Sequence, residues 1–458
     1  MLELQHIQKI YFLGIGGIGM SALARYFHAR GAQVWGYDRT RTALTDTLTQ
    51  EGMHIHYEAD SGHIPEEIDL AVYTPAIPPD HVVLRYLQQQ DILLMKRAEV
   101  LGLISRNSRT LAVAGTHGKT TTSSMLAWLL KSNGVDATAF LGGIAHNFGS
   151  NYVAGHDEWV VIEADEFDRS FLHLHPEAAA ILSIDADHLD VYGSAESVWQ
   201  TGYQPFAQRV KEHLVVRHDL ADRFVERPLY TFGIECGQLS ARRIGVADGW
   251  FVFDLTTPQG QWEGVRLPLP GAHNVLNALA ALSLAQYAGV PFEKAIAALA
   301  TFKGVWRRFD WCHRGTRYVY IDDYAHHPAE LEEVIGAARA LFAERRITVV
   351  FQPHLYTRTR DFLAGFAQAL SKADEVVLLD IYPAREMPIP GVSADLLAQT
   401  ISGVPVTRVV KEEVVDLLAQ KELEVLLTLG AGDIDQLRAP IAQMLRAREV
   451  QQTVGGGV

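Results

Sequence analysis

A segment with two glycines, a lysine and three threonines is the part of the sequence best suited to carry out chemistry. It reads Gly115-Thr-His-Gly-Lys-Thr-Thr121. Residues 110–114 precede it and are typical of a buried strand, while residues 123–132 carry apolar side chains at helical spacing. Glycines between a strand and a helix let backbone N–H groups close on phosphate at the positive end of the helix. The segment therefore predicts a nucleotide-phosphate site, with ATP as the first inference.

The residues of this phosphate loop (residues 115–121) have separate expected roles. Lys119 is expected to reach the β- and γ-phosphates, and the Thr120 hydroxyl to bind Mg²⁺. The spacing is shorter than the full phosphate-loop pattern, because Val113 occupies the position of its first glycine. The residues expected to contact ATP here are Gly115, Thr116, His117, Gly118, Lys119, Thr120 and Thr121.

Acidic side chains follow the strand predicted at residues 158–162. They are Glu163, Asp165, Glu166 and Asp168. A carboxylate at the end of a buried strand downstream of the phosphate loop is where a second Mg²⁺ ligand belongs, and Glu163 is the first choice. The other three remain rivals, and a solvated acidic loop is the alternative. His188, after a strand predicted at 178–184, could ligate the metal through a ring nitrogen.

A second set of glycines lies near the start of the chain. A strand at residues 9–13 leads into Gly14-Ile-Gly-Gly-Ile-Gly-Met20, a helix over 21–30, and a strand over 33–37 that ends at Asp38. Spaced glycines and a later acid for a ribose hydroxyl are typical of a Rossmann-like opening, which can take a pyrophosphate. Only about 100 residues precede the phosphate loop, too few for both halves of an NAD domain.

Length and element pattern predict an α/β protein of three domains. A chain of 458 residues is too long for one core. Beyond residue 304, predicted strands at 317–322, 347–352, 375–380 and 424–429 alternate with helical stretches, as in a mostly parallel sheet. We expect a Rossmann-like domain over 1–107, a central phosphate-loop domain with a mostly parallel sheet over 108–304, and a Rossmann-like domain over 305–450.

Composition excludes several classes of partner. The net charge of −14 argues against a binder of nucleic acid or membrane surfaces. The long apolar run over 267–290 is interrupted by polar residues, so no membrane insertion is expected. The two cysteines, Cys236 and Cys312, cannot form a disulfide framework, which favours the cytoplasm.

Two further groups of polar residues lie near predicted domain edges. Asn274 and Asn277 are three apart at the start of a predicted helix, where they could contact a purine or cap the helix, and the residues alone favour capping. Arg307 and Arg308 lie at the junction of the second and third domains, where a cationic clamp could respond to domain closure.

Taken together, the motifs resemble those of the Mur ligases in the same order, from about residue 9 to 435. The matching segments are Gly14–Met20, Gly115–Thr122, Glu163–Glu166, Asp187–His188, His273–Asn277, Arg307–Phe309, Asp322–Pro328 and Phe351–His354. The resemblance implies that the first domain holds a UDP-linked substrate, the second ATP, and that the third closes to deliver an amino acid. Related ligases that add later residues carry a carbamylated lysine after the Asp-His pair. This chain has no lysine between His188 and Lys211, which fits the alanine-adding branch.

The resemblance also implies a role for particular side chains. The catalytic set would be Lys119, Glu163, His188, Arg308 and Asp323, with Thr120, Glu163 and His188 on the metal. Asn274, Asn277, Arg308 and Asp323 would contact ATP, which replaces the capping interpretation. The UDP-substrate residues would be Gly14, Gly16, Gly17, Gly19, Met20, Asp38, Thr74 and Ala76. The alanine and carboxylate site would be Tyr324, His326, His354 and Arg358. The residue after His354 is Leu355, where several relatives have arginine.

The implied reaction joins L-alanine to the carboxylate of UDP-N-acetylmuramate at the expense of ATP, through an acyl phosphate, with Mg²⁺ or Mn²⁺ as cofactor. The chain would act as a monomer or homodimer. A nicotinamide-linked dehydrogenase would leave residues 115–122 unused, and a phosphate-loop switch protein would leave the polar strand ends of the third domain unused. A sister ligase that attaches a preformed peptide to the same nucleotide would share most of these sites.

Overall fold

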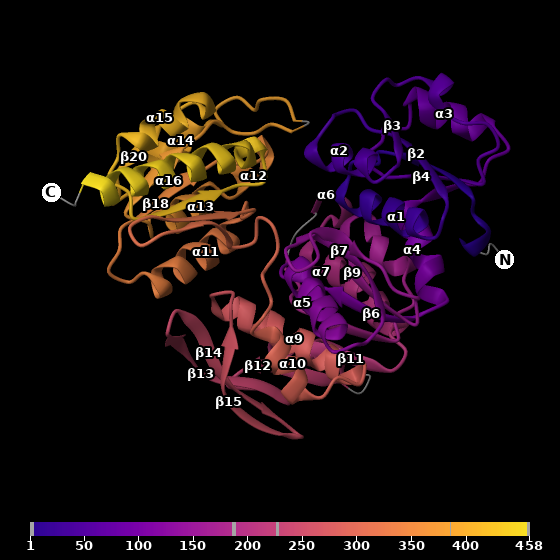
Figure 1. Cartoon of the computed structure of the whole chain (residues 1–458), viewed down its shortest axis with the longest axis horizontal. Helices are drawn as coiled ribbons and strands as arrows, with labels where there is room; N and C mark the ends of the chain where they lie inside the picture. Colours follow the sequence, from indigo (N-terminus) through magenta and orange to yellow (C-terminus); the bar gives the residue numbers. More distant parts are fainter. Residues whose placement is uncertain (1–3, 186–188, 226–228, 385, 456–458) are drawn as a thin grey trace. The chain divides into compact units, whose positions relative to one another are not determined.

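The computed structural model describes residues 4–185, 189–225, 229–384 and 386–455. The chain divides into two compact units (Figure 1). The first comprises Met1–Ile244, Phe253–Pro268 and Val275–Lys303, and the second comprises Gly245–Val252, Leu269–Asn274 and Gly304–Val458.

The first sheet has five parallel strands in the order β3-β2-β1-β4-β5. They are β1 (Lys9–Leu13), β2 (Gln33–Tyr37), β3 (His54–His56), β4 (Leu70–Tyr73) and β5 (Leu94–Lys96). The accompanying helices are η1 (Leu4–His6), α1 (Ile18–Ala29), α2 (Ala43–Gln50), η2 (Ser61–His63), α3 (Val82–Gln89) and α4 (Arg97–Arg106). The strand order reverses between β1 and β4, and open α/β sheets bind ligands outside the strand ends at such a point.

The second sheet has ten strands in the order β15-β14-β13-β12-β11-β10-β6-β9-β7-β8. They are β6 (Arg109–Ala114), β7 (Ala137–Ala145), β8 (Ser150–Val153), β9 (Trp159–Ala164), β10 (Ala178–Ile181), β11 (His213–Arg217), β12 (Tyr230–Ile234), β13 (Leu239–Ala247), β14 (Trp250–Thr257) and β15 (Gly260–Leu267). Strands β10, β6, β9 and β7 are parallel neighbours. The apolar strand β6 is fully buried from Leu111 to Ala114, so the phosphate loop begins at the centre of the parallel part of this sheet.

The helices of this region surround the parallel strands or follow them in the chain. They are α5 (Lys119–Ser132), η3 (Phe167–His173), α6 (Leu189–Tyr192), α7 (Ala195–Val198), η4 (Trp199–Tyr203), α8 (Gln204–Arg209), η5 (His218–Phe224), α9 (Ala272–Tyr287) and α10 (Phe292–Leu299). Strand β9 extends to Ala164 and pairs Glu163 with Val113 of β6. Glu163 therefore lies within the strand, whereas the sequence predicted that the strand would end before it.

The third sheet has six strands in the order β16-β17-β21-β18-β19-β20. They are β16 (Asp310–Arg314), β17 (Val319–Asp323), β18 (Ile347–Phe351), β19 (Glu375–Leu378), β20 (Val406–Arg408) and β21 (Val425–Leu429). The helices are α11 (Pro328–Leu341), α12 (Tyr356–Asp361), α13 (Leu363–Leu370), α14 (Ala394–Thr400), η6 (Lys411–Glu413), α15 (Val414–Ala419), η7 (Asp433–Leu437) and α16 (Arg438–Gly455). The four predicted strands are present, and the antiparallel β16 and the short β20 were not predicted.

The predicted fold class is confirmed, because three sheets rich in parallel pairs alternate with helices along the chain. Buried aliphatic and aromatic side chains fill each region, such as Phe12 and Phe27 in the first and Phe351 and Phe366 in the third. Across the four described stretches of the chain, no helix is both long and apolar enough to cross a membrane.

Candidate active site

The phosphate loop joins β6 to α5 through two glycines in conformations that other residues rarely adopt. Gly115 has φ of 143° and Gly118 has φ of 83°. A Cβ on Gly115 would lie 2.9 Å from the Leu182 Cβ atom, so the backbone passes close to the chain that follows β10. Among the described residues, no side chain caps α5 at Gly118. The first-turn N–H groups of α5 are thereby left for an anion.

Lys119 folds back over this loop. Its ammonium group donates to the carbonyl oxygens of Gly115 at 2.7 Å and Thr116 at 3.3 Å, and to both Glu166 oxygens at 2.7 and 3.0 Å. Burial alone would lower the pKa of Lys119, but the carboxylates of Glu166 and Asp165 outweigh it and raise the pKa. A protonated amine is thus held at the place predicted for the β- and γ-phosphates.

Glu166 is the acid that pairs with Lys119, and its side chain is only 3% exposed. Burial raises the pKa of Glu166, and the nearby ammonium group opposes that rise. The Tyr192 hydroxyl donates to the Glu166 backbone carbonyl at 2.7 Å, which fixes this part of the chain. The sequence placed Glu166 among the possible metal ligands, and the structure places it on the lysine instead.

Glu163 lies beside Thr120, the other residue predicted to bind the metal. The Thr120 hydroxyl donates to Glu163 Oε1 at 3.0 Å, and the Gly142 N–H donates to Oε2 at 2.9 Å. A hydroxyl and a carboxylate at the start of a phosphate-binding helix are hard oxygen ligands of the kind that Mg²⁺ prefers. The two oxygens predicted to hold the ion therefore lie together, and their role as ligands stays a prediction. The third predicted ligand, His188, lies outside the described residues.

The two remaining carboxylates of the acid segment (residues 163–168) point to cations of the first sheet's region. Asp165 lies 3.8 Å from Arg97, and Asp168 lies 3.2 Å from Lys96. The four acids, of which the sequence favoured Glu163 as the metal ligand, are therefore distinguished by their partners. Glu163 is the one that contacts Thr120.

Replacing Glu163 with glutamine is expected to weaken Mg²⁺ binding by at least about 10- to 100-fold, the range seen when groups that orient a metal's ligands are changed. The amide is uncharged and has one acceptor oxygen in place of two. The Mg²⁺ concentration needed for half-maximal ADP formation measures the effect. Asp168→Asn serves as the matched control, and an equal shift in both variants would contradict the assignment.

Asn277 lies against the phosphate loop, and its predicted contact with the nucleotide stays a prediction. A Cβ on Gly118 would be 2.3 Å from Asn277 Oδ1, so this amide occupies the space that glycine leaves open. Asn277 is 7% exposed and comes from the first turns of α9. The Asn274 amide donates to the Pro270 carbonyl at 2.7 Å. Its predicted contact with ATP stays a prediction.

The first glycine loop (residues 14–20) lies at the carboxyl ends of β1, β2 and β4. The Gly14 and Ile15 N–H groups donate to the Tyr37 carbonyl at 2.8 and 3.0 Å. Asp38 accepts from the Gly16 N–H at 2.8 Å and from the Thr40 N–H at 3.1 Å. A Cβ on Gly14 would lie 3.0 Å from the Thr74 methyl group, so the loops after β1 and β4 touch.

Helix α1 starts from this loop, and within the described chain no side chain caps it at Gly17. Met20 is buried at 2% exposure, whereas Ala76 is exposed beside Thr74. The structure thus brings the predicted UDP-substrate residues together at one sheet edge. Their contacts with a substrate stay a prediction.

The adjacent arginines of the third region lie in different environments. Arg307 is 7% exposed on its side chain, and its Nε donates to Asp322 at 3.1 Å. The Arg307 guanidinium also donates to the Gly430 carbonyl. Both guanidinium groups lie near the Tyr324 ring, at 5.2 Å for Arg307 and 5.3 Å for Arg308, but Arg308 remains partly exposed. Arg307 is therefore a buried structural cation, while Arg308 is open to a ligand.

Asp323 is held by backbone groups on both carboxylate oxygens. The Phe309 N–H donates at 2.6 Å and the Ala325 N–H at 2.8 Å. Burial raises the pKa of Asp323 from 3.8 to about 6, although Arg308 and the two N–H groups act in the opposite direction. The predicted contact between Asp323 and ATP stays a prediction.

The raised pKa of Asp323 predicts a pH-dependent contribution to stability. Because the folded state binds this proton more tightly than the unfolded chain, stability on this account is highest below pH 3.8 and falls as the pH rises to about 6. The loss amounts to about 3 kcal/mol. Urea unfolding from pH 4 to 7 should show a steeper decline for the natural chain than for Asp323→Asn. Parallel declines would contradict the raised pKa.

The four residues predicted for the amino-acid site gather at the ends of β17 and β18. The Tyr324 and His326 ring centroids are 5.2 Å apart, and those of His326 and His354 are 6.1 Å apart. Burial lowers the pKa of His326, and Arg358 on α12 acts in the same direction. His326 Nδ1 lies 2.9 Å from the Tyr324 carbonyl, which can only accept. The neutral ring therefore carries its proton on Nδ1 and its lone pair on Nε2.

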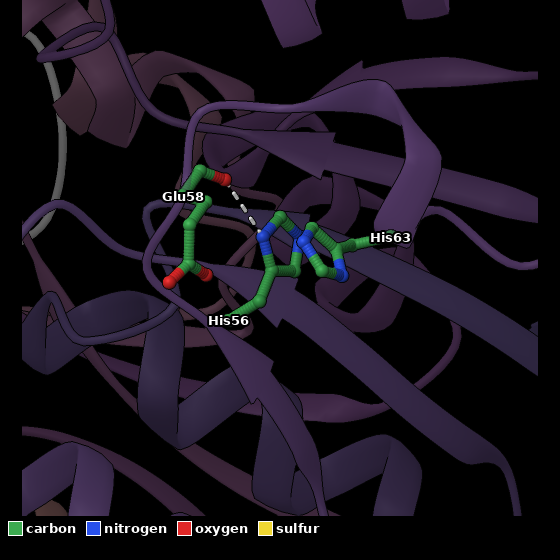
Figure 2. Close-up of side chains that lie close together, drawn as sticks. All are labelled: His56, Glu58 and His63. Atoms are coloured by element: carbon green, nitrogen blue, oxygen red, sulfur yellow. Dashed lines mark hydrogen bonds between the residues drawn. The ribbon is translucent and has the colours of Figure 1, made fainter.

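A further group of possible metal ligands lies at the end of β3, where His56, Glu58 and His63 approach one another (Figure 2). His56 Nδ1 contacts the Glu58 backbone carbonyl at 2.9 Å, and Nε2 contacts the Tyr11 hydroxyl at 2.9 Å. The His56 and His63 rings stack with centroids 4.7 Å apart. Both ring nitrogens of His56 therefore already have hydrogen-bond partners in the protein. We interpret this group as hydrogen-bonded side chains at the end of β3 and not as a metal site.

Three sequence models of one family together match most of the chain. They describe the Mur ligase family catalytic domain at residues 9–109, the Mur ligase middle domain at residues 113–285, and the Mur ligase glutamate ligase domain at residues 307–433. The chain belongs to the Mur ligase family. The resemblance inferred from the motifs is thereby confirmed.

Curated Mur ligases match nearly the whole chain. A UDP-N-acetylmuramate–L-alanine ligase of Flavobacterium johnsoniae is 43% identical over 453 residues, which are 97% of this chain and 99% of that protein. One of Christiangramia forsetii is 46% identical over 447 residues, 95% and 97% of the two chains.

Solved Mur ligase structures have the same fold. The UDP-N-acetylmuramate–alanine ligase of Thermotoga maritima superposes with a TM-score of 0.85 at 28% identity, over 97% of this chain and 100% of that one. A murein peptide ligase of Psychrobacter arcticus gives a TM-score of 0.70 at 23% identity, over 96% and 98% of the two chains. At that identity the second likeness concerns the fold alone.

Sequence reasoning missed the partners that this Mur ligase gives to its acid segment. Neither the Lys119–Glu166 pair nor the contacts of Lys96 and Arg97 with Asp168 and Asp165 were predicted. The available signal was two adjacent cations in one segment and two acids three residues apart in another. Such a pattern is too common on protein surfaces to be singled out without the structure.

Proposed function

We propose that this chain ligates L-alanine to the carboxylate of UDP-N-acetylmuramate and converts ATP to ADP and phosphate. The observation that carries the proposal is 43–46% identity, over 95–97% of the chain, to curated enzymes that bear this name. The phosphate loop supports it, because Lys119, Thr120 and Glu163 are arranged for a nucleotide triphosphate beside a parallel sheet.

The chemistry requires activation of the sugar carboxylate. A carboxylate and an ammonium group do not form an amide at neutral pH, so the γ-phosphoryl group of ATP passes to the carboxylate and gives an acyl phosphate and ADP. The alanine amine then attacks the acyl carbon, and phosphate leaves. Lys119 opposes the charge that gathers on the phosphoryl oxygens.

The residues that would hold Mg²⁺, or Mn²⁺ in its place, are Thr120 and Glu163, with His188 as a further ligand. The Thr120 hydroxyl and the Glu163 carboxylate lie 3.0 Å apart, and oxygen donors of this kind fit such an ion. A divalent ion held there would supply positive charge against the charge of the phosphate oxygens. Lys119 would provide the protein's own positive charge at the same phosphate loop.

In this proposal, a side chain of the third region removes a proton from the alanine ammonium group. His326 is the candidate that the geometry favours, since its Nδ1 proton is engaged by the Tyr324 carbonyl and its lowered pKa keeps the ring neutral. Its Nε2 lone pair can then take a proton from the ammonium group. Arg358 supplies positive charge for the alanine carboxylate, with Tyr324 and His354 beside it.

Each of the three regions that contain a sheet would bind a different substrate. We propose that residues 1–107 bind the UDP portion, residues 108–304 bind ATP, and residues 305–450 deliver alanine with Arg308 and Asp323 toward the nucleotide. With two free cysteines among the described residues, we place the chain in the cytoplasm.

ADP release with each possible acceptor tests the proposal. The full chain with ATP, Mg²⁺ and UDP-N-acetylmuramate should release ADP when alanine is added, and no more than background when a preformed tripeptide replaces it. The reverse preference would identify the peptide-attaching sister activity. With ¹⁸O in the substrate carboxylate, label should appear in the released phosphate, and its absence would exclude the acyl phosphate.

A further inference from the structure

Two adjacent cations link the first sheet's region to the acid segment. Lys96 ends β5 and Arg97 begins α4. Lys96 pairs with Asp168 at 3.2 Å, and Arg97 lies 3.8 Å from Asp165. The same acid segment holds Lys119 through Glu166 and contacts Thr120 through Glu163. A short stretch of chain therefore touches both the phosphate loop and the start of α4.

The Arg97 guanidinium also lies directly against the first glycine loop. A Cβ on Gly19 would be 2.3 Å from Arg97 Nη1 and 3.0 Å from its Cζ atom. Gly19 is the second residue of α1, so the cation rests on the first turn of that helix. The positive end of α1 and a guanidinium thus meet beside the loop that is predicted to take a diphosphate.

Arg97 is suited to be shared between two anions. Its side chain is 21% exposed, and the 3.8 Å separation from Asp165 is longer than a direct hydrogen bond. A guanidinium offers five N–H groups in a plane, so one edge can face a carboxylate while another faces a phosphate. The Asp165 carboxylate accepts from the Phe167 N–H at 3.2 Å, which fixes it in place.

We propose that Arg97 binds the diphosphate of the sugar nucleotide and that Asp165, from the acid segment, is a positioning residue that aims it there. The inference rests on the proposed function, because it takes a UDP-linked substrate in the first glycine loop. The acid segment would then contribute to two sites. Asp165 would act at the UDP-substrate site, and Glu163 and Glu166 at the ATP site. The proposal also explains the glycine at position 19, because any side chain there would displace the Arg97 guanidinium.

Isothermal titration of the full chain with UDP-N-acetylmuramate tests this assignment. Arg97→Gln is expected to raise the Kd by about tenfold, as for loss of a charge-assisted hydrogen bond. Asp165→Asn should raise it by a smaller factor, and the double variant should match Arg97→Gln alone, because Asp165 acts through Arg97. The Kd for ADP should stay within about twofold in Arg97→Gln, which a general loss of structure would not allow.

Further variants separate the contact from net charge and from folding. Arg106→Gln removes a cation from the other end of α4, where Arg106 contacts His175 at 3.1 Å, and should leave the Kd unchanged. Gly19→Ala keeps all charges and favours the helix, yet should weaken binding by displacing Arg97. Arg97→Lys should restore part of the affinity, and Arg97→Gln should reduce the dependence of the Kd on salt.

The outcomes distinguish this inference from the proposed function. If the natural chain binds UDP-N-acetylmuramate and Arg97→Gln binds it equally well, the role of Arg97 is wrong. Equal weakening by Arg97→Gln and Arg106→Gln would also overturn it, because the effect would then come from net charge. If the effects of Arg97→Gln and Asp165→Asn simply add, Asp165 does not position Arg97. If the natural chain binds no UDP-N-acetylmuramate at all, the proposed function itself fails.

Discussion

Replacing Lys119 with alanine is expected to lower the rate of ADP formation by about 10³-fold, the scale on which single charges act in phosphoryl transfer. The Lys119 amine is held over the phosphate loop by two carbonyl oxygens and Glu166. Its pKa is raised, so the positive charge is present at neutral pH. Steady-state ADP release with alanine and UDP-N-acetylmuramate measures the loss.

The same substitution leaves the Glu166 carboxylate buried without its cation, which could reduce activity through unfolding. The double variant Lys119→Met with Glu166→Gln removes both charges together, and should recover the melting temperature of the natural chain but not its activity. Thermal unfolding of both variants provides the comparison. Near-natural turnover in the double variant would show that Lys119 supports the fold and takes no part in phosphoryl transfer.

Replacing Arg307 with methionine is expected to lower the free energy of unfolding of the third region by about 3–5 kcal/mol, the cost of removing one partner of a buried ion pair. The Asp322 side chain is fully buried and lies 3.1 Å from Arg307 Nε. Burial raises the pKa of Asp322, while Arg307 and Arg438 oppose the rise. Without Arg307 the carboxyl keeps only Arg438 and the Thr428 hydroxyl as compensation. Urea unfolding followed by tryptophan fluorescence gives the measurement.

Arg308 is the matched control for this experiment, because it is adjacent in the chain and carries the same charge. Its guanidinium is partly exposed over the Tyr324 ring, so Arg308→Met should change stability by less than about 1 kcal/mol. It should instead lower ADP formation, since Arg308 is the arginine open to a ligand. Equal destabilisation by the two variants would contradict the separation of their roles.

Local sequence determined the elements that surround each glycine loop. Lys-Ile-Tyr-Phe-Leu before Gly14 and Thr-Leu-Ala-Val-Ala before Gly115 are short apolar runs, and helical spacing follows each loop. The positions of these strands and helices depend on residues close together in the chain, because hydrophobic periodicity and the backbone conformations open to glycine are local properties. The observed β1, α1, β6 and α5 agree with the predicted elements, within a few residues at their ends.

Only the tertiary structure decided which side chain meets which. The sequence favoured Glu163 as the metal ligand but could not assign a partner to any of the four acids of the segment, because those partners come from α5, β5 and α4, which are distant in the chain. It likewise could not show that Arg307 is buried on Asp322 while its neighbour stays partly exposed. Side-chain charge and spacing fix what a residue can do, but burial and the opposing group arise from packing across the fold, and these set its protonation and its partner.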